Sequence, residues 1–128
     1  MARFPHDCCL PASQLLAQYL VTELRMPMVT FVRGEREHPE QTDRWQSHMW
    51  LRTLDYFIDI TADQYPEVQD PVMVMADSEW HATFLYQVEL PYGEVMYFNR
   101  AGQWRFNRAY RDVLRTLPRV QRIRSSPR

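Results

Sequence analysis

The sequence predicts an α+β fold, with an N-terminal helix packed on an antiparallel sheet and a second helix near the C-terminus. The first observation is a run of apolar residues at helical spacing from about Cys9 to Leu24. The second is a series of short apolar, β-branched and aromatic runs between residues 28 and 99, which is typical of strands. The third is a return of helical spacing over residues 103–117. This order of helix, strands and helix favours α+β over other fold classes.

The N-terminal helix has a clear start and stop. Pro11 fits the first helical turn, where its missing N–H costs no hydrogen bond, and Pro27 ends the segment. Apolar residues recur three and four positions apart, as a buried stripe requires. They are Ala12, Leu15, Leu16, Tyr19, Leu20 and Leu24. We therefore expect one face of this helix to contact the core.

The middle of the chain is predicted to form strands. The segments are 28–32, 48–53, 56–61, 71–75, 81–91 and 93–99. Residues 48–61 have the pattern of a β-hairpin with a short turn. The continuous apolar run at 71–75 predicts a buried strand, whereas 93–99 is expected at a sheet edge. Residues 33–47 are polar and aperiodic, so they are predicted to form an exposed loop, and Pro118 is expected to end the last helix.

Length and charge bound the domain organisation. The 128 residues are 45% hydrophobic and 24% charged, which predicts one domain over residues 1–118 and a flexible basic tail at 119–128. Residues 1–99 carry six arginines and fifteen acids, a net charge of −9, whereas residues 100–128 carry nine arginines and one acid, a net charge of +8. Such a segment can bind nucleic acid or an acidic membrane, but its aromatic residues do not form a nucleic-acid module. We expect it instead to lie against the acidic part of its own chain.

The N-terminus and the cysteines indicate the cellular compartment. No apolar segment resembles a signal peptide, and no apolar run approaches the roughly 20 residues that span a bilayer. Cys8 and Cys9 are the only cysteines, and a disulfide between neighbours would be strained. A structural zinc site would need a second ligand pair, which the sequence does not offer. We therefore expect a cytoplasmic protein with reduced thiols and no metal ion or other cofactor.

Cys9 is the candidate nucleophile because it stands where the first helix begins. The free N–H groups and dipole of a helix N-terminus favour a thiolate. A hairpin with an even-numbered turn pairs residues whose numbers sum to 109, which places His48 and Asp59 on one face of the sheet. As diagonal neighbours they can form a hydrogen bond. Cys9, His48 and Asp59 thus have the residue types of a nucleophile, its base and the acid that orients the base.

A second histidine, His81, is a competing base. It is close to Asp77 in sequence, but no acid lies at strand spacing from it. We favour His48 because Asp59 lies on the partner strand. Trp50, on the same face as His48, is expected to form a wall of the site or of the core.

The three candidate residues lie in motifs that resemble a known superfamily. Cysteine at a helix start, then H-x-W on one strand and D-x-T on the next, is similar to the transglutaminase-like branch of the papain-like superfamily. Here these motifs are Cys9, HMW at 48–50 and DIT at 59–61. Arylamine N-acetyltransferases and the leader-peptide proteases of lasso-peptide maturation share the Cys-His-Asp order. The stretches FPHDCCLPAS, QSHMW and DITADQ also resemble a group of small bacterial proteins, and the resemblance covers most of residues 4–85.

The resemblance implies a papain-like core and a cysteine-dependent acyl-transfer enzyme acting through a thioacyl intermediate. A peptidase, an amidase and a transglutaminase-like enzyme all fit, with a protein or peptide as substrate. Papain-like proteases place a glutamine shortly before the cysteine, and this chain has none there. Gln46 or Gln64, together with the backbone N–H of Cys9, is therefore the candidate for binding the oxyanion.

Three positions depart from the first motif of the bacterial group, which is close to FPxGxCGDAS. Asp7 stands in place of a glycine, and Leu10 and Pro11 stand in place of a Gly-Asp pair. Pro11 removes one backbone N–H near the expected anion site. These departures support an alternative function, a catalytically lapsed papain-like scaffold that binds a partner protein.

Overall fold

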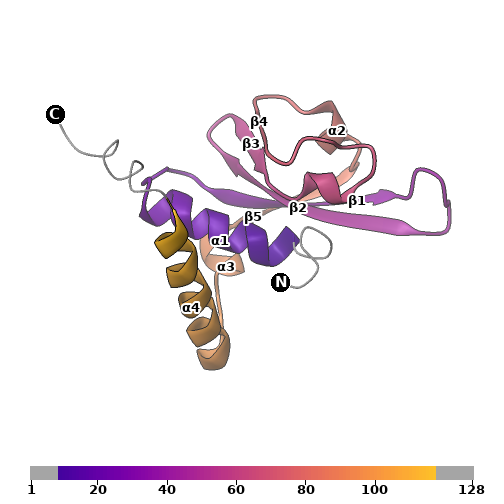
Figure 1. The fold of residues 1–128 in the computed structure, drawn as a ribbon. Helices are drawn as coiled ribbons and strands as arrows, with labels where there is room; N and C mark the ends of the chain where they lie inside the picture. Colours follow the sequence, from indigo (N-terminus) through magenta and orange to yellow (C-terminus); the bar gives the residue numbers. More distant parts are fainter. Residues whose placement is uncertain (1–8, 118–128) are drawn as a thin grey trace. The chain divides into compact units, whose positions relative to one another are not determined.

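The computed structural model describes residues 9–117 (Figure 1). Its elements are α1 (Cys9–Thr22), β1 (Thr30–Glu37), β2 (Trp45–Thr53), β3 (Tyr56–Asp59), a 3₁₀ turn η1 (Ala62–Gln64), β4 (Met73–Met75), α2 (Glu79–Ala82), β5 (Tyr86–Pro91), α3 (Tyr92–Val95) and α4 (Arg100–Thr116). Internal contacts divide the chain into two compact units, residues 1–96 and 97–128. The single domain over 1–118 stays a prediction, and the predicted tail at 119–128 lies outside the described residues.

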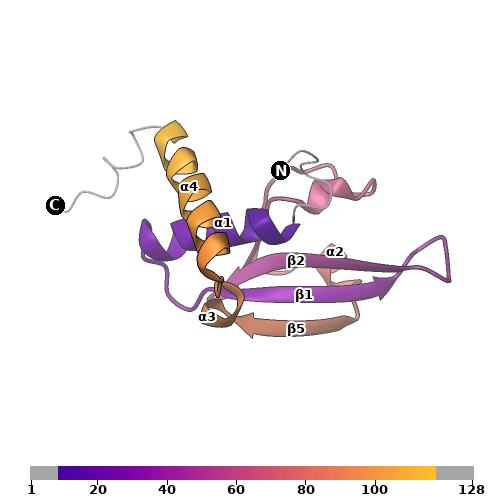
Figure 2. The ribbon, with the colours of Figure 1, turned by 90° about the horizontal axis from the view of Figure 1, so that it is seen from below.

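The first unit is a five-stranded antiparallel sheet with helices on both faces. The strand order is β4-β3-β2-β1-β5, and every neighbouring pair is antiparallel. The helix α1 packs along one face, mainly over β2, and the short α2 lies on the other (Figures 1 and 2). The α+β prediction is therefore confirmed, with the N-terminal helix packed on the sheet as expected.

Alternation along β1 and β2 builds a separate apolar cluster on each face. Phe31 and Leu51 point toward α1, where they join Ala17 and Leu20 in the first cluster. Their sequence neighbours Val32 and Trp50 point to the opposite face of the sheet. There they pack with Tyr65 and Phe84 in the second cluster. The face of the second cluster also carries His48 and Asp59.

The exposed loop predicted at residues 33–47 is wrong for most of its length. β1 continues to Glu37 and β2 begins at Trp45, so only the segment between them is irregular. Exposed and buried residues alternate along β1, and the buried ones include Gly34 and Arg36. The alternation of buried and exposed residues is not visible in the sequence, because Arg36 is charged and yet occupies a buried position.

Arg36 is only 6% exposed, and its guanidinium is held from several sides. Its nitrogens donate to Gln46 Oε1 at 2.7 Å, to Thr83 Oγ1 at 2.7 Å and to Glu67 Oε2 at 2.6 Å. The guanidinium also lies 4.4 Å from the centre of the Phe84 ring. These contacts compensate for the loss of water around the charge.

The predictions for the outer strands need three corrections. β4 is an edge strand of the described sheet rather than a buried one, and Val74 is 59% exposed. The strand predicted at 81–91 begins only at Tyr86, because residues 81–82 belong to the helix α2 and residues 83–85 connect it to β5. The edge strand predicted at 93–99 is wrong, since Tyr92–Val95 forms the helix α3.

The predicted hairpin and its register are confirmed. Leu51 pairs with Ile58, and Thr53 pairs with Tyr56, so the paired residue numbers sum to 109. The turn consists of two residues, Leu54 and Asp55. Leu54 has a φ of 53°, in the left-handed region that a two-residue hairpin turn requires. This turn fixes which residues of β2 and β3 share a face.

The second unit contains α4, which was expected over residues 103–117. It begins earlier, at Arg100, because the Asn99 side chain caps it by accepting the N–H of Gly102 at 2.7 Å. Phe106 stacks on Phe98 with ring centres 4.9 Å apart. The helix ends at Thr116, and Pro118, expected to stop it, lies outside the described residues. Among residues 9–117, no helix is long and apolar enough to cross a membrane.

Candidate functional site

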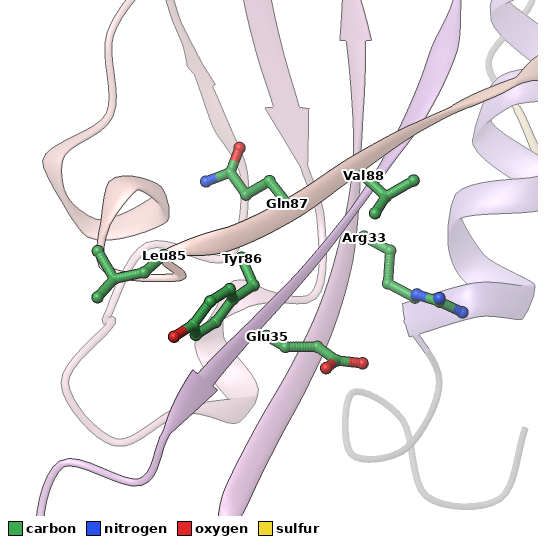
Figure 3. A pocket seen from close by; sticks show the side chains of 6 residues that line it. All are labelled: Arg33, Glu35, Leu85, Tyr86, Gln87 and Val88. Atoms are coloured by element: carbon green, nitrogen blue, oxygen red, sulfur yellow. The ribbon is translucent and has the colours of Figure 1, made fainter.

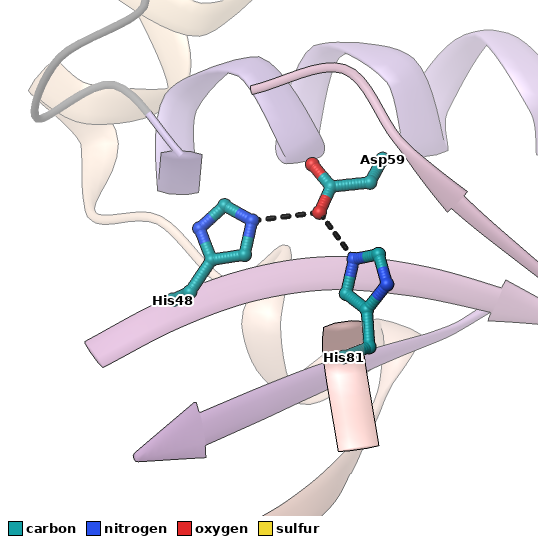
Figure 4. A group of neighbouring side chains, drawn as sticks. All are labelled: His48, Asp59 and His81. Carbon is teal, nitrogen blue, oxygen red and sulfur yellow. Dashed lines mark hydrogen bonds and ion pairs between the residues drawn. The ribbon is translucent and has the colours of Figure 1, made fainter. Parts of the chain in front are cut away.

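Two neighbouring strands bring His48 and Asp59 together. His48 lies on β2, and Asp59 ends β3 on the same face of the sheet, as the register implies. His48 Nε2 lies 2.7 Å from Asp59 Oδ2, which is a hydrogen bond between two nearly inaccessible side chains (Figure 4). The contact expected from the hairpin is therefore present.

Cys9 is the first residue of α1 and is partly buried. Its side chain packs at the border of the first cluster and also lies close enough to affect His48. Burial lowers the pKa of His48, but hydrogen bonds and charge interactions with Asp59 and Cys9 outweigh it and raise that pKa above 6.5. The three predicted residues thus come from α1, β2 and β3 and interact through the His48 ring. Cys8 lies outside the described residues.

Asp59 holds its negative charge although it is buried. Burial raises the pKa of Asp59, but hydrogen bonds from His48 and His81 reverse the effect and lower it well below 3.8. The backbone N–H of Thr61 donates to the second carboxylate oxygen, Oδ1, at 3.0 Å. Both oxygens therefore accept hydrogen bonds, and the carboxylate is fixed in place.

His81 is the functional candidate whose position the sequence did not indicate. It lies on α2, and its Nε2 is 2.6 Å from Asp59 Oδ2, the oxygen that also binds His48 (Figure 4). The sequence offered no acid at strand spacing from His81, and its acid partner is Asp59 on β3. A local signal does exist, because Ser78 caps α2 by accepting the backbone N–H of His81 at 3.1 Å. That signal predicts a helix start but not the distant carboxylate.

The three weaker candidates differ in their distance from this group. Gln64, on η1, has its Nε2 3.2 Å from His48 Nδ1, the ring nitrogen that does not contact Asp59. Gln46 is occupied elsewhere, because its Oε1 accepts from Arg36. Trp50 is 1% exposed and lies against both histidines, with ring centres 5.7 Å from His48 and 4.5 Å from His81. Within the described residues, its Nε1 has no hydrogen-bond partner.

Aromatic rings enclose His48 and exclude water from it. The nearest ring centres lie 5.3 to 6.0 Å away. They belong to Trp50, Tyr65, Trp80 and Phe84. Burial raises the pKa of Tyr65, whose hydroxyl donates to the Ser47 carbonyl at 2.8 Å. In such an apolar enclosure, the ion pair between His48 and Asp59 is stronger than it would be in water.

The same three polar side chains are close enough to be considered as metal ligands. One ligand atom from each of His48, Asp59 and His81 lies within 4.8 Å of the others. However, Asp59 Oδ2 lies 2.7 and 2.6 Å from the two Nε2 atoms. Ligands about 2.0–2.1 Å from a tetrahedral zinc ion would be spaced more widely, at about 3.3 Å. The distances fit shared protons better than a shared cation.

Two surface pockets lie on different sides of the sheet. One of about 360 Å³ adjoins the aromatic enclosure through Trp80 and is also lined by Arg36, Gln46, Glu67 and Thr83. The other, of about 410 Å³, lies over β1 and β5 (Figure 3). Its lining residues are Arg33, Glu35, Leu85, Tyr86, Gln87 and Val88. On β1, the lining residues alternate with Gly34 and Arg36, so this pocket opens on the face opposite the candidate site.

Comparisons with models of known families, with curated proteins and with solved structures found no match for this chain. Its function is therefore inferred from the contacts of Cys9, His48 and Asp59.

Proposed function

We propose that this protein is a cysteine-dependent acyl-transfer enzyme with a papain-like, transglutaminase-like core. Cys9 is the nucleophile, His48 is the general base and acid, and Asp59 orients His48. A protein or peptide is the substrate. The observation that carries the proposal is the 2.7 Å bond from His48 Nε2 to Asp59 Oδ2, together with the effect of Cys9 on the same ring.

The bond to Asp59 assigns a role to each nitrogen of His48. An ionised Asp59 can only accept, so Nε2 carries a proton and donates it to Oδ2. The other nitrogen, Nδ1, is then the atom that exchanges a proton with Cys9 or with the substrate. Gln64 Nε2 lies 3.2 Å from Nδ1, which supports Gln64 as the proposed donor to the oxyanion.

The first half of the reaction acylates Cys9. His48 Nδ1 takes the thiol proton, and the sulfur attacks the substrate carbonyl carbon, so that a C–S bond forms and the π electrons move to oxygen. When the carbonyl re-forms, the C–N bond of the amide breaks. The proton on His48 Nδ1 passes to the leaving nitrogen. A thioester on Cys9 and a free amine result.

The second half releases the acyl group. His48 Nδ1 takes a proton from water, and the oxygen attacks the thioester carbon. The C–S bond breaks, the sulfur regains the proton from His48, and a carboxylic acid leaves. With an amine in place of water, the same transfers give a new amide. The Gln64 side chain and the Cys9 backbone N–H are the proposed donors to the oxyanion.

Thiol labelling tests the proposal directly. We expect iodoacetamide to alkylate Cys9 near neutral pH faster than it alkylates a free thiol, because His48 stabilises the thiolate. The chain supplies its own control, since Cys8→Ser should keep the fast reaction and Cys9→Ala should abolish it. Mass spectrometry of the modified peptide would assign the site. His48→Gln should slow the labelling of Cys9 by about tenfold or more.

Two results would contradict the proposal. One is a wild-type protein in which Cys8 reacts and Cys9 does not. The other is a Cys9 that reacts no faster than a free thiol and is indifferent to His48→Gln. A peptide thioester probe that acylates Cys9, followed by water or amine as acceptor, would then distinguish hydrolysis from transfer.

The lapsed scaffold remains a second candidate because of one observation. His48 is only 1% exposed, and aromatic rings surround it, so the site could serve to hold the fold together. Under this hypothesis, Cys9 is unreactive and His48→Gln lowers stability alone. The labelling experiment above, combined with urea unfolding of the same variants, distinguishes the two functions.

A further inference from the structure

Two histidines share one oxygen of Asp59, although a nucleophile–base–acid triad needs only one. His48 Nε2 is 2.7 Å from Asp59 Oδ2, and His81 Nε2 is 2.6 Å from the same atom (Figure 4). His81 is 1% exposed and comes from α2, on the far side of Asp59 from His48. The mechanism above assigns it no part.

The proton inventory around His81 is complete. Asp59 is ionised, so His81 Nε2 donates to it. Ser78 Oγ already accepts the backbone N–H of His81, which leaves the Ser78 hydroxyl proton free to donate to His81 Nδ1. Ser78 therefore sets the ring tautomer, and the ring presents its N–H to Asp59.

We propose that His81 is a positioning residue, which holds Asp59 Oδ2 between the two rings and limits how strongly Asp59 binds His48. The proposal rests on the proposed function, because its consequence is felt at the base of that reaction. A carboxylate oxygen that accepts two N–H groups gives each of them a weaker bond than it would give one. His48 consequently releases its proton to the leaving group more readily than with an undivided partner.

Groups other than His81 also face His48 and contribute to its titration. Cys9 approaches from α1, Asp59 from β3, and Tyr65 from the segment after η1. Gln64 lies beside His48 Nδ1. Of these groups, Asp59 is the direct partner of His81, so a change in the titration of His48 after a substitution at position 81 would report on the bond between His81 and Asp59.

The test is the titration of the histidine rings by NMR in the full-length protein, without substrate. His81→Phe keeps a ring but removes the donor, so Asp59 should bind His48 alone and the pKa of His48 should rise. His81→Gln can place an amide N–H near the former Nε2, so the pKa of His48 should return toward the wild-type value. His38, which lies between β1 and β2 and away from this group, is the control, and His38→Gln should leave His48 unchanged.

The outcomes separate a positioning role from a structural one. A His48 ring that titrates at the wild-type pH or lower in His81→Phe, in protein that is folded, would overturn the proposal. So would a His81→Gln variant that behaves like His81→Phe. If His81→Phe does not fold, Ser78→Ala keeps the ring and frees its Nδ1, and a smaller rise in the pKa of His48 is expected. No rise there would also overturn the proposal.

Failure of the proposed function would look different. In that case, Cys9 of the wild-type protein reacts no faster than a free thiol, whatever the titration of His48 shows. If the proposed function and the proposed role of His81 are both correct, His81→Phe should lower the rate of acyl transfer by about tenfold. Loss of a residue that orients a functional side chain commonly has an effect of this size.

Discussion

The candidate site depends on one buried charge, that of Asp59. Its carboxylate accepts from His48, His81 and the Thr61 backbone, and all three side chains are almost inaccessible. An apolar residue at this position could not accept these three hydrogen bonds, and a carboxylate without them would be expelled from the core. Asp59 therefore joins the fold and the site in a single residue.

The first prediction is the pH dependence of stability. Because the pKa of Asp59 is lowered on folding, its contribution is present above about pH 3.8 and is lost as the pH falls below that value. Because the pKa of His48 is raised, its contribution is present below about pH 6.5 and is lost as the pH rises through the folded pKa. The free energy of unfolding in urea should therefore be highest between these values.

Asp59→Asn provides the control for this profile. The variant should be less stable than the wild type at every pH measured. The losses of stability at low and at high pH should both be smaller, because neither the carboxylate nor its effect on His48 remains. If the free energy of unfolding of the wild type did not fall at low and high pH, or if Asp59→Asn showed the same falls, other groups would govern the pH dependence.

At the scale of the elements, close packing between strands and loops fixes the face that carries the site. Gly34 on β1 lies beneath Trp50 and Phe84, where an added Cβ would be 2.7 Å from Trp50 Cη2 and 2.8 Å from Phe84 Cβ. Neither neighbour can move into solvent, because Trp50 is 1% exposed and Phe84 is fully buried. This close approach positions Trp50 against both histidines.

The second prediction follows from that contact. Gly34→Ala should lower the free energy of unfolding by about 2 kcal/mol, the usual cost of overpacking a rigid core. Gly93→Ala is the matched control, since an added Cβ there meets nothing within 4 Å and lies in the helix α3. It should be neutral or stabilising by up to about 1 kcal/mol. Equal stabilities of the two variants in urea would contradict the packing described.

The third prediction concerns the hairpin turn. Leu54 has a φ of 53°, which costs a leucine about 1 kcal/mol and costs a glycine little. Leu54→Gly should therefore raise the free energy of unfolding by about that amount, without loss of packing because Leu54 is exposed. Asp55→Gly is the control, because Asp55 does not have a positive φ and gains nothing from glycine. If Asp55→Gly stabilised the protein and Leu54→Gly did not, the backbone strain would lie at Asp55 and the prediction would be contradicted.

At the scale of the whole molecule, the chain divides at Met96, close to where its charge changes sign. Residues 1–96 hold six arginines and fifteen acids, a net charge of −9, and residues 97–128 hold nine arginines and one acid, a net charge of +8. Both apolar clusters and the whole candidate site belong to the first unit. The change of charge is visible in the sequence, whereas a single domain over residues 1–118 stays a prediction.

The fourth prediction tests this division. A chain that ends at Met96 should unfold cooperatively and keep its Cys9 labelling rate, because the contacts of the core and the site lie within it. Circular dichroism during urea unfolding and iodoacetamide labelling would measure the two properties. A fragment that unfolds without cooperativity would instead favour one domain over residues 1–118.

The sequence by itself determined α1 and the β2–β3 hairpin. Both depend on local rules. Pro11 in the first turn and apolar residues at helical spacing define α1, and a two-residue turn sets the register of the hairpin. The contact between His48 and Asp59 follows from that register. By contrast, the short helix α3 was mistaken for a strand because four residues are too few to show a period.

Only the tertiary structure decided the burial of Arg36 and the partner of His81. Arg36 is charged and lies between charged residues, so its sequence neighbourhood gives no sign of the aromatic rings and hydrogen-bond acceptors that enclose it. His81 lies 22 residues from Asp59, and no acid stands at strand spacing from it in the sequence. Which acid a histidine meets depends on how separate elements pack, and the local sequence carries no record of that distance.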